Sequence, residues 1–184
     1  QIIPMKYIFL FLSLLLFIYM ILPGPRSING FPPLPNSTKS TLEGDTIQIP
    51  NVSAYFSNNF RWFVTDFYRE SYLQNTWLPF PPFRLNHPPE FAFDYIKKHT
   101  DSTYLEEYVY PLRDSLFVNG FEPFYEDESP KYWGATKFEI EGQELLTKVT
   151  LRYYPSPFLV RIIVWLGIIA AALLLWRLWM LNFP

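Results

Sequence analysis

The last apolar run of the chain, Phe158 to Leu181, constrains its folding more than any other stretch. No charged residue interrupts the fifteen positions between Arg161 and Arg177. A helix needs about 20 consecutive apolar residues to cross the roughly 30 Å hydrocarbon core of a bilayer. Tryptophans lie toward both ends of the run, as in the aromatic belts of membrane proteins. The sequence therefore predicts a C-terminal transmembrane helix over residues 158–181.

A second apolar run opens the chain. It is interrupted by Ser13 and ends before Pro23, where a helix cannot continue. The pattern predicts an N-terminal transmembrane helix over residues 5–22 that acts as an uncleaved signal-anchor. A cleaved signal peptide and a buried or interfacial helix are the alternatives. Residues 1–4 precede Met5. A methionine and a lysine before an apolar run are typical of a translation start, so we expect residues 1–4 to be upstream sequence and not part of the protein.

Composition limits the chemistry of the region between the two runs. Aromatic residues make up 20% of the sequence and there are 18 prolines, which favours an aromatic core with turn-rich connections. The net charge is −2 and no basic patch is present, so we expect no nucleic-acid binding. The chain has no cysteine, which excludes disulfides, thiolate metal sites and a cysteine nucleophile.

The first half of the middle region predicts an arm followed by a helix. Residues 23–50 are rich in proline and serine and favour an irregular arm, with a short strand at 46–49. Residues 51–75 predict a helix that Asn51 or Ser53 caps. Apolar side chains three or four residues apart form its packing face, namely Val52, Phe56, Phe60, Phe63 and Phe67.

Two further helices are expected in the second half. Residues 77–83 contain three prolines and favour an extended path, and Pro89 then opens a short helix over 89–98. Residues 103–118 predict a longer helix, which Pro111 kinks or divides. Its apolar side chains follow steps of four, three and four residues, at Leu105, Val109, Leu112 and Leu116.

The strongest strand pattern lies over residues 136–154. Apolar and charged residues alternate in two runs, and Gly142 and Gln143 can turn between them, which predicts a β-hairpin. A further strand is expected at 121–125. We therefore expect an α+β fold over residues 51–157, a small antiparallel sheet with about three packed helices, bracketed by two transmembrane helices.

Two spans would put both termini on one side of the membrane and the domain on the other. We expect the termini to lie in the cytoplasm and the domain outside it. Lys6 ahead of the first apolar run is typical of a secretory signal or a signal-anchor, and this favours that orientation. Basic residues also flank the spans on the domain side, but such charges lose their influence when a loop is longer than about 60 residues. Few residues extend beyond either span, so we expect no cytoplasmic output domain. Any signalling or energy coupling would therefore need a partner protein within the membrane.

The sequence offers few residues for catalysis. An enzyme acting on glycan or lipid would draw on Glu106, Glu107, Asp114 or His99 at a membrane-facing cleft. Neighbouring carboxylates are more often solvated surface than a catalytic pair, because acid–base partners must face each other across the substrate. We expect no catalytic, cofactor-binding or metal site.

Two sets of side chains are candidates for binding. Exposed aromatic side chains are expected to dock a protein or stack on sugar rings, unless they pack in the core or at the headgroup layer; they are Trp77, Phe80, Phe83, Tyr132 and Trp133. In the C-terminal helix, Gly167 and Ala171 lie four residues apart, a spacing that lets helices approach closely. This pair predicts self-association or docking on another membrane protein.

These observations favour a membrane-anchored envelope protein without catalytic activity. Its external domain would bind or scaffold a partner as an accessory subunit of a larger membrane assembly. A second hypothesis comes from Pro155-Ser156-Pro157, which precedes the last span. Together with two terminal spans and an external middle, this segment gives a layout that resembles the polysaccharide copolymerases. The resemblance implies a role in glycan chain length or export. A membrane-associated enzyme on glycan or lipid is the third hypothesis.

Overall fold

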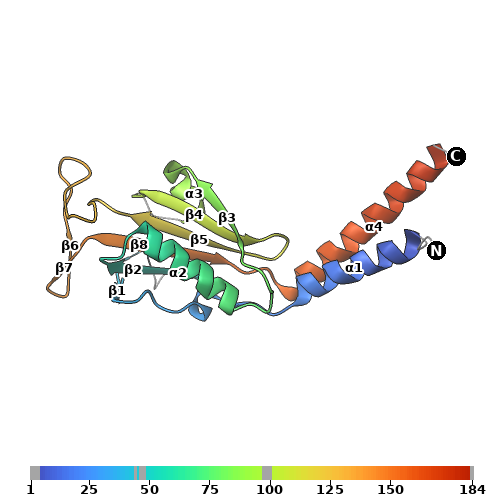
Figure 1. The fold of residues 1–184 in the computed structure, drawn as a ribbon, viewed down its shortest axis with the longest axis horizontal. Coiled ribbons are helices and arrows are strands. Elements are labelled where there is room, and N and C mark those ends of the chain that lie inside the picture. The colour runs from blue at the N-terminus through green and yellow to red at the C-terminus, as the bar shows by residue number, and fades with distance from the viewer. Residues whose placement is uncertain (1–4, 44, 46–48, 97–100, 183–184) are drawn as a thin grey trace. The chain divides into compact units, whose positions relative to one another are not determined.

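A computed structural model describes residues 5–43, 45, 49–96 and 101–182 (Figure 1). The fold is α+β, as the sequence predicts, and its sheet is antiparallel. The chain forms two compact units. One is a domain spanning Gly24–Pro155, and the other is a pair of apolar helices from the two ends of the chain.

The domain is built on a six-stranded sheet in the order β1-β2-β8-β5-β4-β3. Its strands are β1 (Ser37–Lys39), β2 (Val52–Ser57), β3 (Phe83–His87), β4 (Tyr104–Tyr110), β5 (Asp114–Phe121) and β8 (Thr147–Tyr154). A separate two-stranded ribbon joins β6 (Phe138–Ile140) to β7 (Gln143–Leu145). The remaining domain elements are the short helices η1 (Ile28–Gly30), η2 (Pro89–Phe91) and α3 (Ala92–Tyr95), and the longer helix α2 (Arg61–Gln74).

The prediction of a helix over 103–118 is wrong. This segment forms the antiparallel hairpin β4–β5, and Pro111 lies in its turn. Leu112 adopts a φ of 63° there, which a helix would not allow. A four-residue step such as Leu105 to Val109 is an even number, so it keeps two side chains on one face of a strand as well as of a helix. The one odd step, from Val109 to Leu112, ends in the turn between the two strands, so the apolar spacing did not separate a hairpin from a helix.

The predicted helix over 51–75 is wrong in its first third. Val52–Ser57 is strand β2, and α2 begins at Arg61. Asn51, expected to cap the helix, instead has a φ of 59° in the turn before β2. All six residues of β2 are buried, since the strand pairs with β1 on one side and β8 on the other. These long-range pairings override the local helical pattern.

The hairpin predicted over 136–154 is divided between two sheets. The turn falls where expected, with Gly142 at a φ of 77°, but β6 pairs with β7. Strand β8 instead lies between β2 and β5 and pairs with both along its length. Of the strand expected at 121–125, Phe121 is the last residue of β5 and Phe124 forms an isolated bridge with Pro130. The strand expected at 46–49 lies mostly outside the described residues, as does the end of the helix expected over 89–98.

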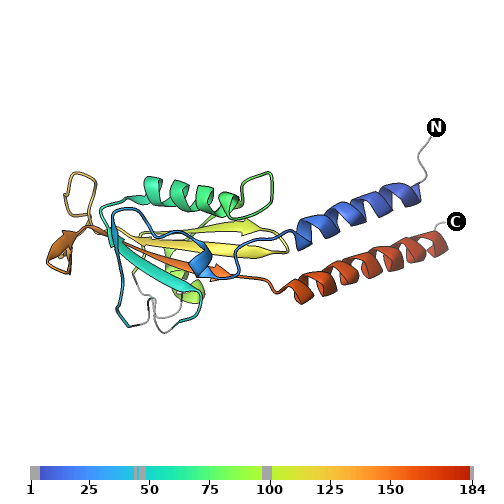
Figure 2. The same ribbon diagram turned by 90° about the horizontal axis from the view of Figure 1, so that it is seen from below.

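Helices cover the two faces of the six-stranded sheet. Figure 2 shows α2 running along one face. Tyrosines fill the layer beneath it, and the rings of Tyr72 and Tyr110 meet edge to face with centroids 5.0 Å apart. On the opposite face, α3 packs Ala92 against Leu105 and Phe117 in an apolar cluster. The domain core therefore has two layers, one on either side of the sheet.

The terminal unit is an antiparallel pair of helices, α1 (Met5–Ile21) and α4 (Phe158–Asn182). The indole Nε1 of Trp165 donates to the carbonyl of Ser13 at 3.1 Å, and its ring lies 4.8 Å from that of Phe17. Among the described residues, α4 is the one helix long and apolar enough to cross a membrane. At 17 residues, α1 falls short of that length. One candidate span is therefore established, where the sequence predicts two.

Arg161 of α4 links the two helices by a hydrogen bond to the end of α1. Its side chain is buried. One Nη1–H donates to the carbonyl of Met20 at 3.3 Å, and Nε–H donates to Ser156 at 3.0 Å. The last carbonyls of a helix lack partners and carry its negative dipole end, so a cation is favoured at the end of α1.

Candidate functional site

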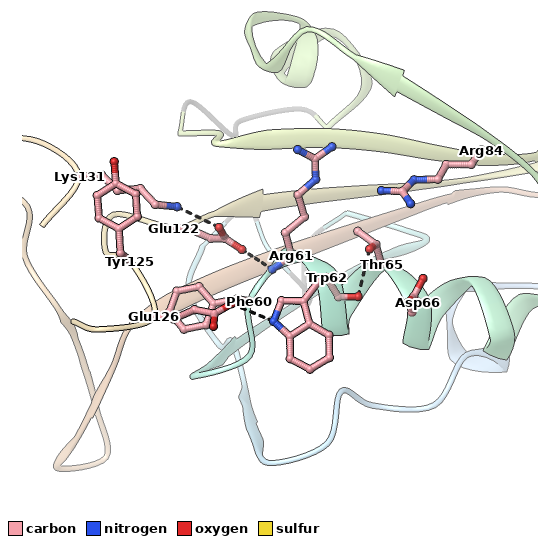
Figure 3. A pocket seen from close by; sticks show the side chains of 10 residues that line it. All are labelled: Phe60, Arg61, Trp62, Thr65, Asp66, Arg84, Glu122, Tyr125, Glu126 and Lys131. Carbon is pink, nitrogen blue, oxygen red and sulfur yellow. Dashed lines mark hydrogen bonds and ion pairs between the residues drawn. The ribbon is translucent and has the colours of Figure 1, made fainter. Parts of the chain in front are cut away.

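A pocket of about 400 Å³ opens beside the first turn of α2 (Figure 3). We call it the Arg61 pocket. Its walls come from α2, from β3 and from the loop that follows β5. The lining residues are Phe60, Arg61, Trp62, Thr65, Asp66, Arg84, Glu122, Tyr125, Glu126 and Lys131.

Beneath the pocket, a buried carboxylate holds two arginines. Glu106 has no exposed surface, and its Oε1 accepts from Arg61 Nε at 2.8 Å and from Arg84 Nη2 at 2.6 Å. The hydroxyl of Tyr108 donates to Oε2 at 2.9 Å. Burying a lone carboxylate is costly, and the two guanidinium groups and the hydroxyl offset that cost. The hydrogen bond that Arg84 donates to Glu106 also raises the pKa of Arg84 above its ordinary value.

A second carboxylate fixes the start of α2. Phe60 precedes the helix and provides no side-chain cap. Glu122 takes that role, because its Oε1 accepts the backbone N–H of Arg61 at 2.5 Å. Its Oε2 accepts from Lys131 Nζ at 3.0 Å. The helix start and the loop after β5 are thereby joined through one side chain.

Tyr104 supports the arginine from the sheet. The guanidinium of Arg61 lies 5.1 Å from the centre of its ring, within the range of a cation–π contact. The ring lies over Gly120 on the paired strand, and a Cβ at that glycine would fall 2.0 Å from a ring carbon. Only glycine leaves room there. Burial and the nearby charge of Glu122 raise the pKa of the Tyr104 hydroxyl well above its ordinary value.

Two exposed aromatic rings line the mouth of the pocket. Trp62 is 65% exposed, and its Nε1–H donates to Glu126 at 2.9 Å (Figure 3). Tyr125 is also exposed, and the Nζ of Lys131 lies 5.4 Å from its ring centre. The indole is therefore oriented by a hydrogen bond at its edge while much of its surface stays open to solvent.

The charges that line the pocket balance. The cations are Arg61, Arg84 and Lys131, and the carboxylates are Asp66, Glu122 and Glu126. The site thus offers both donors and acceptors of hydrogen bonds beside aromatic surfaces. Within residues 5–43, 45, 49–96 and 101–182, no group of three or more metal-ligating side chains could hold a metal ion.

The aromatic residues predicted to form a binding surface lie at opposite ends of the sheet. Trp77, Phe80 and Phe83 lie in or beside the loop that enters β3, and all three are exposed. Tyr132 and the fully exposed Trp133 directly follow the pocket residue Lys131, at the far end of β5. The five side chains do not form one surface, and the second group adjoins the Arg61 pocket along the chain.

The predicted helix-packing residues lie on the face of α4 that turns away from α1. Gly167 and Ala171 are exposed, and a Cβ added at Gly167 would meet no atom of the described residues within 4 Å. Helix α1 instead packs on the side of α4 that carries Arg161 and Trp165. The small residues therefore remain open to a partner, and the prediction for them stands as a prediction.

The four candidates for acid–base chemistry do not converge. Glu106 and Glu107 point to opposite faces of β4, as neighbours on a strand must. Asp114 lies at the far end of that hairpin, beside Arg113, and His99 lies outside the described residues. The expectation that neighbouring carboxylates are solvated is wrong for Glu106, which is fully buried.

Glu107 has a cluster of its own on the other face of the sheet. The His87 Nε2 lies 2.8 Å from its Oε2, and the hydroxyl of Ser115 donates to its Oε1. In a serine hydrolase the histidine stands between the serine and the acid, so that it can take the hydroxyl proton. Here the carboxylate stands between them, so the cluster lacks that arrangement.

The sequence did not single out the residues of the pocket. Arg61, Arg84 and Lys131 are scattered along the chain, and their common environment depends on the pairing of β3 with β4 and of β4 with β5. One local signal was present. Glu106 lies between Tyr104 and Tyr108 at steps of two, which marks a charged residue on the buried face of a strand.

Comparison with protein-family models, with curated proteins and with solved structures gave no match.

Proposed function

We propose that the chain is a membrane-anchored binding protein, and that it acts as a non-catalytic subunit of a larger membrane assembly. Its domain takes a ligand in the Arg61 pocket, and α4 holds that domain at the membrane. The observation that carries the proposal is the preassembled pocket. Its arginines and lysine are already paired with carboxylates, and an exposed indole is fixed at its mouth. Groups held in this way favour binding, since they need little reordering when a ligand arrives.

We further propose that α1 is a second span and that the domain lies outside the cytoplasm. The contacts of α1 along α4 support a shared membrane environment for the two helices. A helix of 17 residues is roughly 25 Å long, slightly less than the hydrocarbon core, and such mismatch can be accommodated at modest cost.

The absence of cysteine makes this orientation directly measurable. Single cysteines would be introduced at the exposed Lys39 of the domain and at Asn182, the last residue of α4. A membrane-impermeant maleimide applied to intact cells should label Lys39→Cys and leave Asn182→Cys unlabelled until the membrane is opened. The reverse pattern would place the domain in the cytoplasm.

Assembly is tested by the mass of the protein purified from its native membranes in mild detergent. We expect a protein mass well above the 21.9 kDa of one chain. Gly167→Leu with Ala171→Leu should reduce that mass, because both residues lie on the open face of α4. Leu173→Phe, on another side of the same helix, is the matched control. A strictly monomeric chain that carries no partner would refute the proposal.

A further inference from the structure

The Arg61 pocket is poorly suited to an anion, although it contains three basic side chains. An anion-binding site needs cations that are not already neutralised, or a helix N-terminus that is free. Here Glu106 engages both arginines and Glu122 engages Lys131. Glu122 also occupies the N-terminus of α2. With Glu106 counted, the carboxylates outnumber the cations.

The pocket equally lacks the features of a purely apolar site. Guanidinium groups and carboxylates both line its wall, and the carboxylates of Glu122 and Glu126 keep lone pairs beyond the hydrogen bonds that they accept. Arg61 and Arg84 remain about 40% exposed, so their outer N–H groups can reach a ligand. A suitable ligand must therefore both donate and accept hydrogen bonds while carrying no net charge.

The aromatic side chains add a requirement for a flat apolar surface. Trp62 presents an open ring beside this polar wall, and the hydrogen bond to Glu126 limits its rotation. Tyr125 adds a second exposed ring from the loop. Large rigid rings supply contact area at low cost in conformational entropy. A saturated ring with a face of C–H groups and a rim of hydroxyls meets both requirements.

We propose that the Arg61 pocket binds a neutral sugar residue of a glycan. The C–H face of the sugar stacks on Trp62, its hydroxyls donate to Glu126 or Asp66, and they accept from Arg61 or Arg84. The volume of about 400 Å³ falls within the roughly 300–1,000 Å³ of small-molecule sites. This inference rests on the proposed function, which makes the pocket the ligand site, and it adds the class of ligand.

The test is calorimetric titration of the full chain in a polyoxyethylene detergent, because detergents with sugar headgroups would compete. The probes are cellotriose, maltotriose and chitotriose as neutral sugars, trigalacturonic acid as an acidic sugar, inorganic phosphate, and trialanine as a peptide. We expect at least one neutral trisaccharide to bind, and more tightly than the acidic sugar or phosphate. Trp62→Ala should weaken that binding about tenfold by removing the stacking surface. Phe93→Ala, which removes a similarly exposed aromatic side chain from α3 on the opposite face of the sheet, should leave it unchanged.

Trp62→Phe separates stacking from the hydrogen bond to Glu126, and it should retain more affinity than Trp62→Ala. Preference for phosphate, trigalacturonic acid or trialanine would overturn the proposal, as would neutral-sugar binding that survives Trp62→Ala. Failure of every probe to bind would also overturn it. The proposed function is judged separately by the mass of the native assembly, so a chain that assembles without binding sugar would refute the ligand class alone.

Discussion

Glu106 and Glu107 are neighbours in the sequence, yet they occupy two different regions of the domain. Glu106 points toward α2, has no exposed surface and is held by two arginines and a tyrosine. Glu107 points to the other face of the sheet, where it meets His87 and Ser115. One step along a strand thus separates the base of a pocket from a small polar cluster.

The difference lies in the permanence of the charges around each carboxylate. Arginine stays protonated at any ordinary pH, so Glu106 is compensated whatever the conditions. Histidine carries a charge only when it is protonated, so the partner of Glu107 is not a permanent cation. Glu106 is therefore suited to be a fixed part of a binding site. The comparison predicts unequal effects when the two faces are altered.

The largest effect is expected from Glu106→Ala. Removing a partner from a buried ion pair leaves uncompensated groups, and we expect a loss of about 3 kcal/mol in the free energy of unfolding. Glu106→Gln should lose less, because the amide can still accept from Tyr108. Chemical denaturation of the full chain in detergent, followed by near-ultraviolet circular dichroism, measures both. A Glu106→Ala protein as stable as the wild type would show that this carboxylate does not stabilise the pocket.

Gly120→Ala tests the position of the Tyr104 ring, which packs between Gly120 and Arg61. A methyl group at this position would overlap the Tyr104 ring, and we expect a loss of about 2 kcal/mol from overpacking. The double variant with Tyr104→Ala should lose less than the sum of the two single variants, since the smaller side chain removes the overlap. Strict additivity in the same denaturation measurement would show that the ring does not lie over the glycine.

Alkaline pH should lower the stability of the domain through the buried tyrosines on the face of the sheet that α2 covers. Burial raises the pKa of Tyr108 above the ordinary value of 10.0, so the unfolded chain ionises first. The stability contributed by the neutral hydroxyl is complete below pH 10 and is lost as the pH rises further. At pH 11 the loss should be about 1.4 kcal/mol for this tyrosine. Tyr108→Phe should flatten the decline above pH 10 by that amount, and an unchanged slope would contradict the assignment.

Glu107→Gln should have the smallest effect. The amide retains an acceptor for Ser115, and we expect a loss of about 1 kcal/mol or less. Chemical denaturation of the full chain measures this loss, as for Glu106→Ala. A loss as large as that of Glu106→Ala would abolish the distinction between the two faces.

The sequence predicted the elements that depend on local pattern. The apolar terminal helices and the turn at Gly142 follow from runs and residue types that a single segment contains. The β4–β5 hairpin was mistaken for a helix because a step of four residues fits both structures. The pocket could not be predicted, since Arg61, Arg84 and Glu122 meet only after strand pairing brings them together.

Photocrosslinking in native membranes tests most directly whether the face of the sheet that α2 covers is the binding face. A benzophenone amino acid would replace Trp62 in the Arg61 pocket or, as the matched control, Leu85 on the opposite face of β3, where it is also exposed. We predict a light-dependent, higher-mass product from position 62 and none from position 85. A product from position 85 alone, or no product from position 62, would contradict the account.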